Sequence, residues 1–117
     1  MQEAYAVDVI NGIVVAQSAA PAMKAAGFGA IIVTGGGFAD HPIPALATVS
    51  LSKAALRSAA TMLEVDLAPD GVRVATLTIA GQIVAGTSFD PARIAERYWE
   101  VVQTDGPWKA EFRFTGE

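Results

Sequence analysis

The sequence predicts an α/β fold in which helices cover a small parallel sheet of about three strands. Segments with helical periodicity alternate with short apolar segments along the 117 residues, and this order requires crossover connections that set the strands parallel. The run Ala30–Val33 is wholly apolar, as expected for a strand buried on both faces. Hydrophobic residues make up 52% of the chain and charged residues 17%, which excludes a disordered protein and predicts a single domain over residues 1–117.

The first predicted helix runs from Gln2 to about Lys24. Its apolar positions recur at intervals of three and four residues, and Pro21 is expected to kink or loosen its last turns. The strand over residues 30–33 comes next. Three glycines and two prolines then predict a loop over Gly35–Pro44, so the first strand is expected to open into a glycine-rich loop.

The rest of the chain predicts two more helices and two more strands. A helix rich in Ala and Leu is predicted over 47–67, and turn residues lead from it into an alternating, β-branched strand over 72–79. A third helix over 90–102 is predicted because an aspartate followed by a proline supplies an N-cap acceptor and a favourable first helical residue. Residues 108–114 alternate again and predict the last strand. The first and last strands are expected to be exposed edges.

Composition excludes several kinds of site. The chain has no cysteine and one histidine, so disulfides, a thiol nucleophile and zinc sites built from Cys or several His are excluded. A net charge of −4 leaves no large basic patch, so no nucleic-acid partner is expected. No apolar run continues for about eighteen uninterrupted residues, so no membrane span is expected. The N-terminus lacks the positive charge of a signal peptide, and a cytoplasmic location is expected.

Several segments together resemble the C-terminal half of the short-chain dehydrogenase/reductase family. They are the helix segment Val7–Met23 with its Gln17 and Pro21-Ala22-Met23, the strand Gly29–Val33, the helix segment Ser52–Leu56 (SKAAL), the strand entry Leu67–Val74 (LAPDGVRV), and Ala80-Gly81 in place of the family's usual Pro-Gly. They agree in order and spacing over nearly the whole chain. The resemblance implies a three-layer, Rossmann-like half-domain of NAD(P)-dependent oxidoreductase lineage. The family's glycine-rich cofactor turn belongs to its first half, so a truncated domain is expected.

The resemblance also implies catalytic positions, most of which are changed here. In the family's Tyr-x-x-x-Lys motif, the tyrosine transfers the substrate proton, and the lysine lowers the tyrosine pKa and binds the cofactor ribose. Lys53 matches that lysine, but Val49 stands in place of the tyrosine and cannot transfer a proton. The family's serine falls on Gly36 and its asparagine on Asp8. Lys53 and Asp8 are the candidate catalytic residues, with a solvated lysine and a surface or capping carboxylate as the alternatives.

The implied cofactor is NAD(P), and its candidate binding residues are Lys53, Gly81 and Thr87. Lys53 corresponds to the ribose contact, and the other two belong to the loop that meets the nicotinamide amide in the family, although Thr87 lies two residues later than the family pattern. The segment 34–41 begins like a phosphate-binding glycine turn, but it lacks the later glycines and no helix follows directly. Any pocket is expected at the carboxyl ends of the strands, near the two glycine-containing loops.

Three side chains outside these motifs carry a second possible role. His41 beside Asp40 suggests an oriented imidazole, with a solvated loop histidine as the alternative. Tyr98 and its neighbour Trp99 fit a gate over a substrate pocket or ordinary helix packing.

We expect a short-chain dehydrogenase/reductase-like protein with weak or no catalysis, because the glycine-rich cofactor motif and the catalytic tyrosine are missing. One alternative is a non-catalytic homo-oligomeric interaction module, since the family's subunit interface corresponds to helices 2–24 and 47–67, the least charged parts of this chain. A second alternative is one half of a split reductase that another subunit completes, or a gene product whose start has been placed too late.

Overall fold

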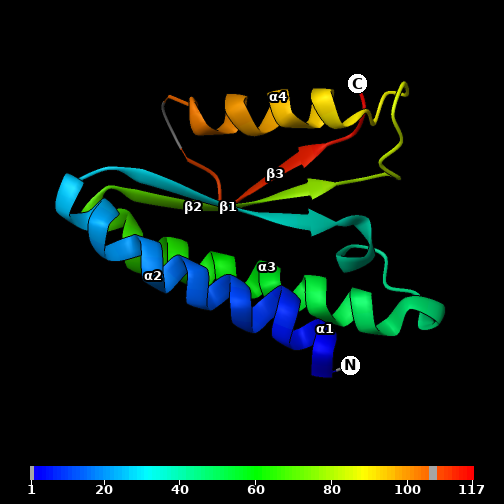
Figure 1. Ribbon diagram of the computed structural model, residues 1–117, viewed down its shortest axis with the longest axis horizontal. Coiled ribbons are helices and arrows are strands. Elements are labelled where there is room, and N and C mark those ends of the chain that lie inside the picture. Colours follow the sequence, from blue (N-terminus) through cyan, green and yellow to red (C-terminus); the bar gives the residue numbers. More distant parts are fainter. Residues whose placement is uncertain (1, 106–107) are drawn as a thin grey trace.

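The computed structural model describes residues 2–105 and 108–117 and contains a parallel sheet with helices on both faces (Figure 1). The N-terminal helical run comprises α1 (Gln2–Tyr5), a π-helical turn (Ala6–Ile10) and α2 (Asn11–Ala26). The elements that follow are β1 (Gly29–Gly36), α3 (Ala47–Leu67), β2 (Val72–Ile79), α4 (Pro91–Val102) and β3 (Glu111–Phe114). The predicted fold class, element order and three-stranded parallel sheet are confirmed.

β2 is the central strand of the sheet, in the order β1-β2-β3. It pairs in parallel with β1 over the full length of both strands, from Gly29–Val72 to Gly36–Ile79, and its last four residues pair with β3. Neighbours on both sides and helices on both faces explain why nearly every residue of β2 is buried. The parallel pairing brings the carboxyl ends of β1 and β2 to the same edge.

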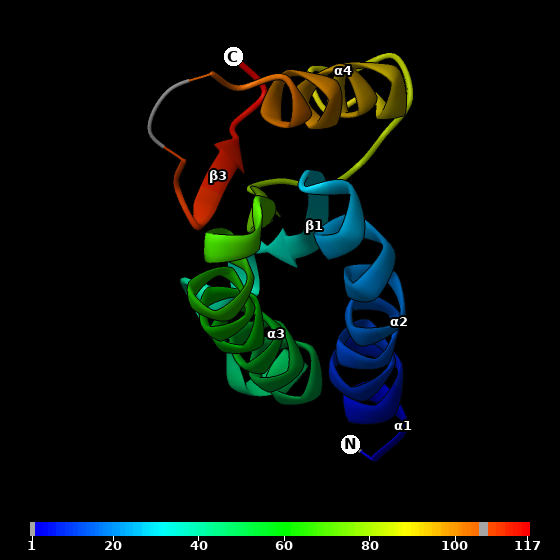
Figure 2. The ribbon, with the colours of Figure 1, turned by 90° about the vertical axis from the view of Figure 1, so that its left-hand side faces the viewer.

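Two apolar clusters fix the helices on opposite faces of the sheet, as Figure 2 shows for α2 and α3 on one side and α4 on the other. Alternate residues of β2 supply the two clusters because successive strand side chains point to opposite faces. The cluster under α2 and α3 contains Ala20, Ala60, Leu67, Val72 and Val74. The cluster under α4 contains Leu77, Ile79, Ile94 and Phe114. Both faces of β2 are therefore covered by helices, and the pocket lies at its carboxyl end.

The N-terminal helical run is longer than predicted. It continues past Pro21 to Ala26, where Gly27 adopts the left-handed conformation (φ 79°) and donates its N–H to the carbonyl oxygens of Met23 (2.9 Å) and Lys24 (3.1 Å). Glycine suits this position because it has no side chain to clash at positive φ. The irregular part of the run is the π-helical turn near its start rather than the turns around Pro21.

The same helical run bears on membrane insertion. Although its apolar residues are not uninterrupted, the helix Gln2–Ala26 is long and apolar enough to span a bilayer, with a mean hydropathy of 1.3 and 17% of its best window buried. A core helix of a soluble protein passes the same test. In this fold, α2 packs against β1 and α3, and Ala16 and Ala20 are buried in those contacts.

The first and last strands differ in length from the prediction. β1 includes Gly35 and Gly36, which were predicted as loop, because they pair with Thr78 and Ile79 of β2. A Cβ on Gly35 would be 2.7 Å from Thr76 Cγ2. β3 begins at Glu111, three residues later than predicted. Trp108 lies outside the strand and instead donates its indole N–H to the Val74 carbonyl oxygen at 3.0 Å.

Candidate functional site

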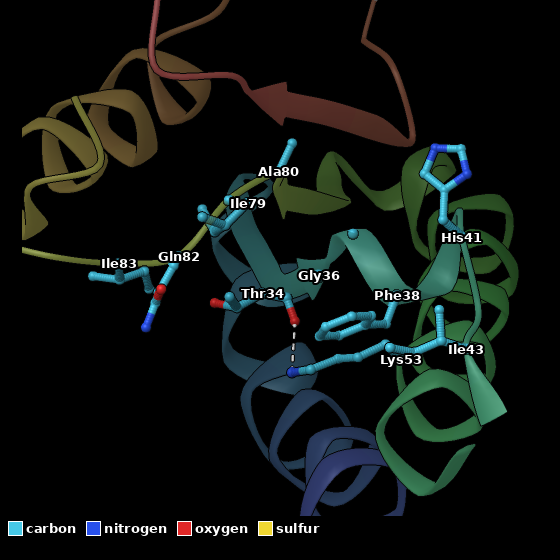
Figure 3. A pocket seen from close by; sticks show the side chains of 13 residues that line it. Thr34, Gly36, Phe38, His41, Ile43, Lys53, Ile79, Ala80, Gln82 and Ile83 are labelled. Carbon is cyan, nitrogen blue, oxygen red and sulfur yellow. Dashed lines mark hydrogen bonds between the residues drawn. The ribbon is translucent and has the colours of Figure 1, made fainter. Parts of the chain in front are cut away.

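A pocket of about 790 Å³ opens at the carboxyl ends of β1 and β2 (Figure 3). Two strand ends, the loops after β1 and β2, and one α3 side chain line it: Thr34, Gly35, Gly36, Gly37, Phe38, His41, Ile43, Lys53, Ile79, Ala80, Gly81, Gln82 and Ile83. The volume lies within the roughly 300–1,000 Å³ of small-molecule sites. Parallel strands leave such a crevice beyond their carboxyl ends, which is where the sequence predicts a pocket.

The glycines of the pocket fall into two groups. A Cβ on Gly35 would lie 2.7 Å from Thr76 Cγ2, and one on Gly81 would lie 2.4 Å from Phe89 Cζ, so close packing within the protein requires glycine at both positions. A Cβ on Gly36 would meet nothing closer than Lys53 Cγ at 3.9 Å, and one on Gly37 would meet nothing within 4 Å. Gly36 and Gly37 therefore leave open space that a ligand can occupy.

Lys53 reaches the pocket from α3, and Figure 3 shows its side chain running beside Phe38 towards the end of β1. Its Nζ donates to the carbonyl oxygen of Thr34 at 3.3 Å. An ammonium group carries three protons, so this single bond leaves two for a ligand. In the described parts of the chain Lys53 forms no ion pair, and it is the one charged side chain among the lining residues.

Val49 lies one helical turn before Lys53 and is 37% exposed. Its isopropyl group can neither donate nor accept a proton at this position on α3. The neighbouring Ser50 is buried, donates its hydroxyl to the Leu46 carbonyl oxygen at 2.8 Å and accepts from the Ile43 N–H at 3.4 Å. Its hydroxyl serves the start of the helix and does not line the pocket, so this turn of α3 presents no acid or base beside Lys53.

The structure brings two of the four candidate site residues to the pocket. Lys53 and Gly81 line it, whereas Asp8 and Thr87 do not. Asp8 is half-buried in the π-helical turn. The Thr87 hydroxyl donates to the Val84 carbonyl oxygen at 2.7 Å and accepts from a backbone N–H two residues on at 3.1 Å, so it closes a turn of the β2–α4 loop.

A charged cluster behind the pocket wall has no counterpart in the sequence analysis. Asp40 accepts two hydrogen bonds from the Arg113 guanidinium (2.7 and 2.8 Å) and one from Arg57 (2.8 Å). Arg57 also donates to the Thr78 hydroxyl at 3.2 Å, and Glu111 lies 3.2 Å from Arg113. The cluster joins the loop after β1 to α3, β2 and β3. No sequence motif reveals it, because its members are up to 73 residues apart.

The cluster shifts the protonation of its members. The hydrogen bonds from Arg113, followed by those from Arg57, hold the pKa of Asp40 well below its usual range despite the opposing effect of partial burial. The bond to Asp40 in turn raises the pKa of Arg113. Asp40 is thus a carboxylate at neutral pH, and its charge is neutralised by arginines rather than presented to the pocket.

His41, Tyr98 and Trp99, each of which had two possible roles in the sequence, lie in different surroundings. Asp40 directs its carboxylate to the two arginines and not to the imidazole, while His41 lines the pocket (Figure 3). Tyr98 packs on the α4 side of the sheet, and its hydroxyl hydrogen-bonds to that of Thr34, which lines the pocket. Trp99 is 62% exposed and is not among the residues that line the pocket.

Comparison with solved structures shows the same fold in several enzymes. A short-chain dehydrogenase from Rhodopseudomonas palustris superposes with a TM-score of 0.82 at 24% identity, over 97% of this chain and 50% of that one. A metagenomic short-chain oxidoreductase in complex with NADP gives 0.74 at 25% identity, over 95% and 50%. A gluconate 5-dehydrogenase from Burkholderia cenocepacia J2315, in complex with NADP and tartrate, gives 0.62 at 25% identity, over 90% and 41%. The chain spans about half the length of these relatives.

Comparison at the level of sequence gives a family assignment. No curated protein matches the chain. The sequence model of the short chain dehydrogenase family matches residues 1–90, which contain the helical run, β1, the Lys53 helix, β2 and both pocket loops. With the strand order, the pocket at the carboxyl ends and the position of Lys53, this match is sufficient: the chain belongs to the short-chain dehydrogenase family.

Proposed function

We propose that this chain forms the part of an NAD(P)-dependent oxidoreductase site that faces the nicotinamide and the substrate, and that proton transfer there is weak or absent. The observation that carries the proposal is the pairing on α3 of Lys53, which lines the pocket, with Val49 one turn before it. The lysine supports binding of a polar cofactor group. With valine at position 49, the side chain that would transfer the substrate proton is absent.

The residues present fit the nicotinamide end of the cofactor. The two unused protons of the Lys53 ammonium would donate to ribose hydroxyls, and Gly36 and Gly37 leave space beside them. Gly81 would contribute backbone at the opposite wall. The nicotinamide, when bound, supplies hydride transfer. The adenosine end would need residues beyond those that line this pocket.

Asp8 and Thr87 do not line the pocket, so the proposal gives neither of them a direct contact with the ligand. We expect Asp8→Asn and Thr87→Ala to change ligand binding less than Lys53→Met does. A cytoplasmic location belongs to the same proposal.

Dinucleotide binding is tested by saturation-transfer NMR on the 117-residue chain with NADPH. The expected result is stronger saturation of the nicotinamide and adjoining ribose protons than of the adenine protons, since the pocket holds only that end. Lys53→Met should weaken the signal, and Lys24→Met, on an exposed lysine that pairs with Asp70 at 3.7 Å, should not. Equal saturation along the whole cofactor, or none at millimolar NADPH, would contradict the proposal.

Proton transfer is tested by the substitution Val49→Tyr. It places a phenol one turn before Lys53, and we expect NADPH-dependent reduction of a panel of aldehydes and ketones to rise by at least about tenfold, below the roughly 10²–10⁴-fold that a positioned acid supplies in a complete site. Val49→Phe is the matched control because it adds the ring without the hydroxyl. Equal rates for the two variants, or a wild-type rate as high as that of Val49→Tyr, would overturn the proposed role of Val49.

A second candidate function is a homo-oligomeric interaction module. The outer faces of the two long helices expose large apolar side chains, which soluble monomers rarely gather in one place. On the N-terminal run these are Tyr5, Val7, Ile10, Val14 and Val15, and on α3 they are Leu51, Met62 and Val65. A self-association experiment follows in the Discussion.

A further inference from the structure

We propose that Tyr98 is a positioning residue whose hydroxyl, acting through Thr34, fixes the Lys53 ammonium in the pocket. The inference rests on the proposed function, in which Lys53 donates to a cofactor ribose and Tyr98 has no part. It also describes the pocket without a ligand. Its test can therefore succeed or fail separately from the NADPH experiment.

The first argument is that Thr34 is bonded from both faces of the sheet. The Lys53 ammonium comes from α3 and donates to the Thr34 carbonyl oxygen at 3.3 Å, as the dashed line in Figure 3 shows. The Tyr98 hydroxyl comes from α4, on the opposite side of the sheet, and hydrogen-bonds to the Thr34 hydroxyl (Figure 1). A displacement of Thr34 would move the acceptor of the lysine, and the bond to Tyr98 opposes that displacement.

The second argument is that the end of β1 has few other means of support. β1 is an edge strand with a neighbouring strand on one side only, and it leads into the three glycines 35–37. Glycine has no side chain through which the backbone can be held, and its backbone is the most flexible of all residues. Thr34 is therefore the last residue of β1 whose side chain can fix this wall of the pocket, and its partner is Tyr98.

The third argument is that Tyr98 is itself held in place. Its ring packs against the apolar cluster between α4 and the sheet, which contains Leu77, Ile79, Ile94 and Phe114. The loop after β2, which forms the opposite wall of the pocket, leads into the same helix. The Tyr98 hydroxyl thus ties the end of β1 to α4, and through α4 it connects the two walls between which a ligand would lie.

The test is Tyr98→Phe, because it keeps the ring in the cluster and removes only the hydroxyl. We would record NMR spectra of the ligand-free chain with ¹³C-labelled lysine. The two Cε protons of Lys53 should differ in chemical shift in the wild type, as for a fixed ammonium, and should average in Tyr98→Phe. Lys24, which lies on α2, is the internal reference and should not change. Tyr5→Phe, on a tyrosine that is 47% exposed, is the matched control.

NADPH binding supplies a second measurement. Tyr98→Phe and Thr34→Val should each weaken it about two- to tenfold, the range that a single hydrogen bond accounts for. The double variant should bind no more weakly than the weaker single variant, because both substitutions remove the same bond. A direct contact with the cofactor does not explain a loss in Tyr98→Phe, since Tyr98 is not among the residues that line the pocket.

Unchanged Lys53 signals in a folded Tyr98→Phe would overturn the inference, and so would additive effects of the two substitutions on NADPH binding. If the unmodified chain binds no NADPH, the proposed function fails, while the Lys53 signals of the ligand-free chain still decide the role of Tyr98. Thr34→Val breaks the same bond from the other partner, so the ligand-free measurement remains decisive if Tyr98→Phe does not fold.

Discussion

Asp40 is the residue through which the loop after β1 joins the charged cluster. It accepts three hydrogen bonds from Arg57 and Arg113, with 16% of its side chain exposed, and so ties the loop after β1 to α3 and β3. We expect Asp40→Asn to lower the free energy of unfolding by about 1–2 kcal/mol at pH 7, because it removes the charge and one acceptor oxygen from two arginines. Urea denaturation measures the difference.

The control for this prediction is Asp70→Asn. Asp70 forms an exposed pair with Lys24 at 3.7 Å, and exposed pairs of this kind contribute little, so the urea midpoint should hardly move. A loss as large as that of Asp40→Asn would show that the general loss of a negative charge, and not the cluster, explains the effect.

The effect of Asp40→Asn should also depend on pH. The arginines lower the folded pKa of Asp40 below the unfolded value of about 3.9, so the carboxylate stabilises the protein above that pH and the contribution disappears as the pH falls through the folded pKa. Wild type and Asp40→Asn should therefore differ most at neutral pH, and the difference should begin to shrink as the pH falls below about 4. A difference that stays constant down to pH 3 would contradict this assignment of the pKa shift.

Gly81 gives a second prediction for a single residue. A Cβ there would lie 2.4 Å from the Phe89 ring, which packs edge-to-face on Phe114 with centroids 5.4 Å apart. Gly81→Ala should cost about 1–3 kcal/mol of stability because the ring must move. Gly37→Ala is the matched control, since nothing lies within 4 Å of its Cβ, and it should change thermal stability little. Equal melting temperatures for the two variants would contradict the argument.

The start of α4 allows a prediction for a whole element. Asp90 accepts hydrogen bonds from the backbone N–H groups of Gly86 (2.7 Å) and Ala92 (2.8 Å), and these bonds lower its pKa. Asp90→Ala removes the cap and should lower the melting temperature, whereas Asp90→Asn, which keeps an acceptor oxygen, should lower it less. The advantage of Asp90 over Ala should diminish in acid, as the carboxylate is protonated when the pH falls through its lowered pKa. Thermal melts at pH 7 and pH 3 measure these differences. An Asp90→Ala variant as stable as wild type at pH 7, or an equal loss at both pH values, would contradict the prediction.

The edges of the sheet show how tertiary contacts set the length of an element. Glycines ordinarily weaken a strand, yet β1 continues through Gly35 and Gly36 because both pair with β2, and at Gly35 the β2 side chains leave no space for a Cβ. At the other edge, Trp108 uses its indole N–H to bond the Val74 carbonyl oxygen, and its ring lies under the Arg73 guanidinium at 5.1 Å. The alternation over residues 108–114 therefore predicts β3 from Glu111 onward, but it places the start of the strand three residues too early.

For the whole molecule, the exposed apolar faces of the two long helices predict self-association. We expect light scattering to give a mass above the 12.1 kDa of one chain. Val14→Glu and Met62→Glu place charges on the two faces, where the present side chains are 50% and 64% exposed, and should shift the protein towards a monomer. Trp99→Glu is the control on α4, on the opposite side of the sheet, and should not change the mass (Figure 1). A monomer at millimolar concentration would contradict the interaction-module candidate.

The sequence by itself determined the order of the elements and the type of sheet. The bounds of α3, β2 and α4 follow from periodicity, β-branched alternation and cap residues, all of which act within a few residues along the chain. It also placed Val49 one turn before Lys53, because helix geometry fixes residues four positions apart on the same side of α3.

Only the tertiary structure decided which candidates meet. It brings Lys53 and Gly81 to one pocket and leaves Asp8 and Thr87 outside its lining, and it assembles Asp40, Arg57 and Arg113 into one cluster. The reason is physical: local patterns specify backbone conformation, whereas contacts between residues tens of positions apart depend on strand register and helix packing, which are set by the folded chain as a whole.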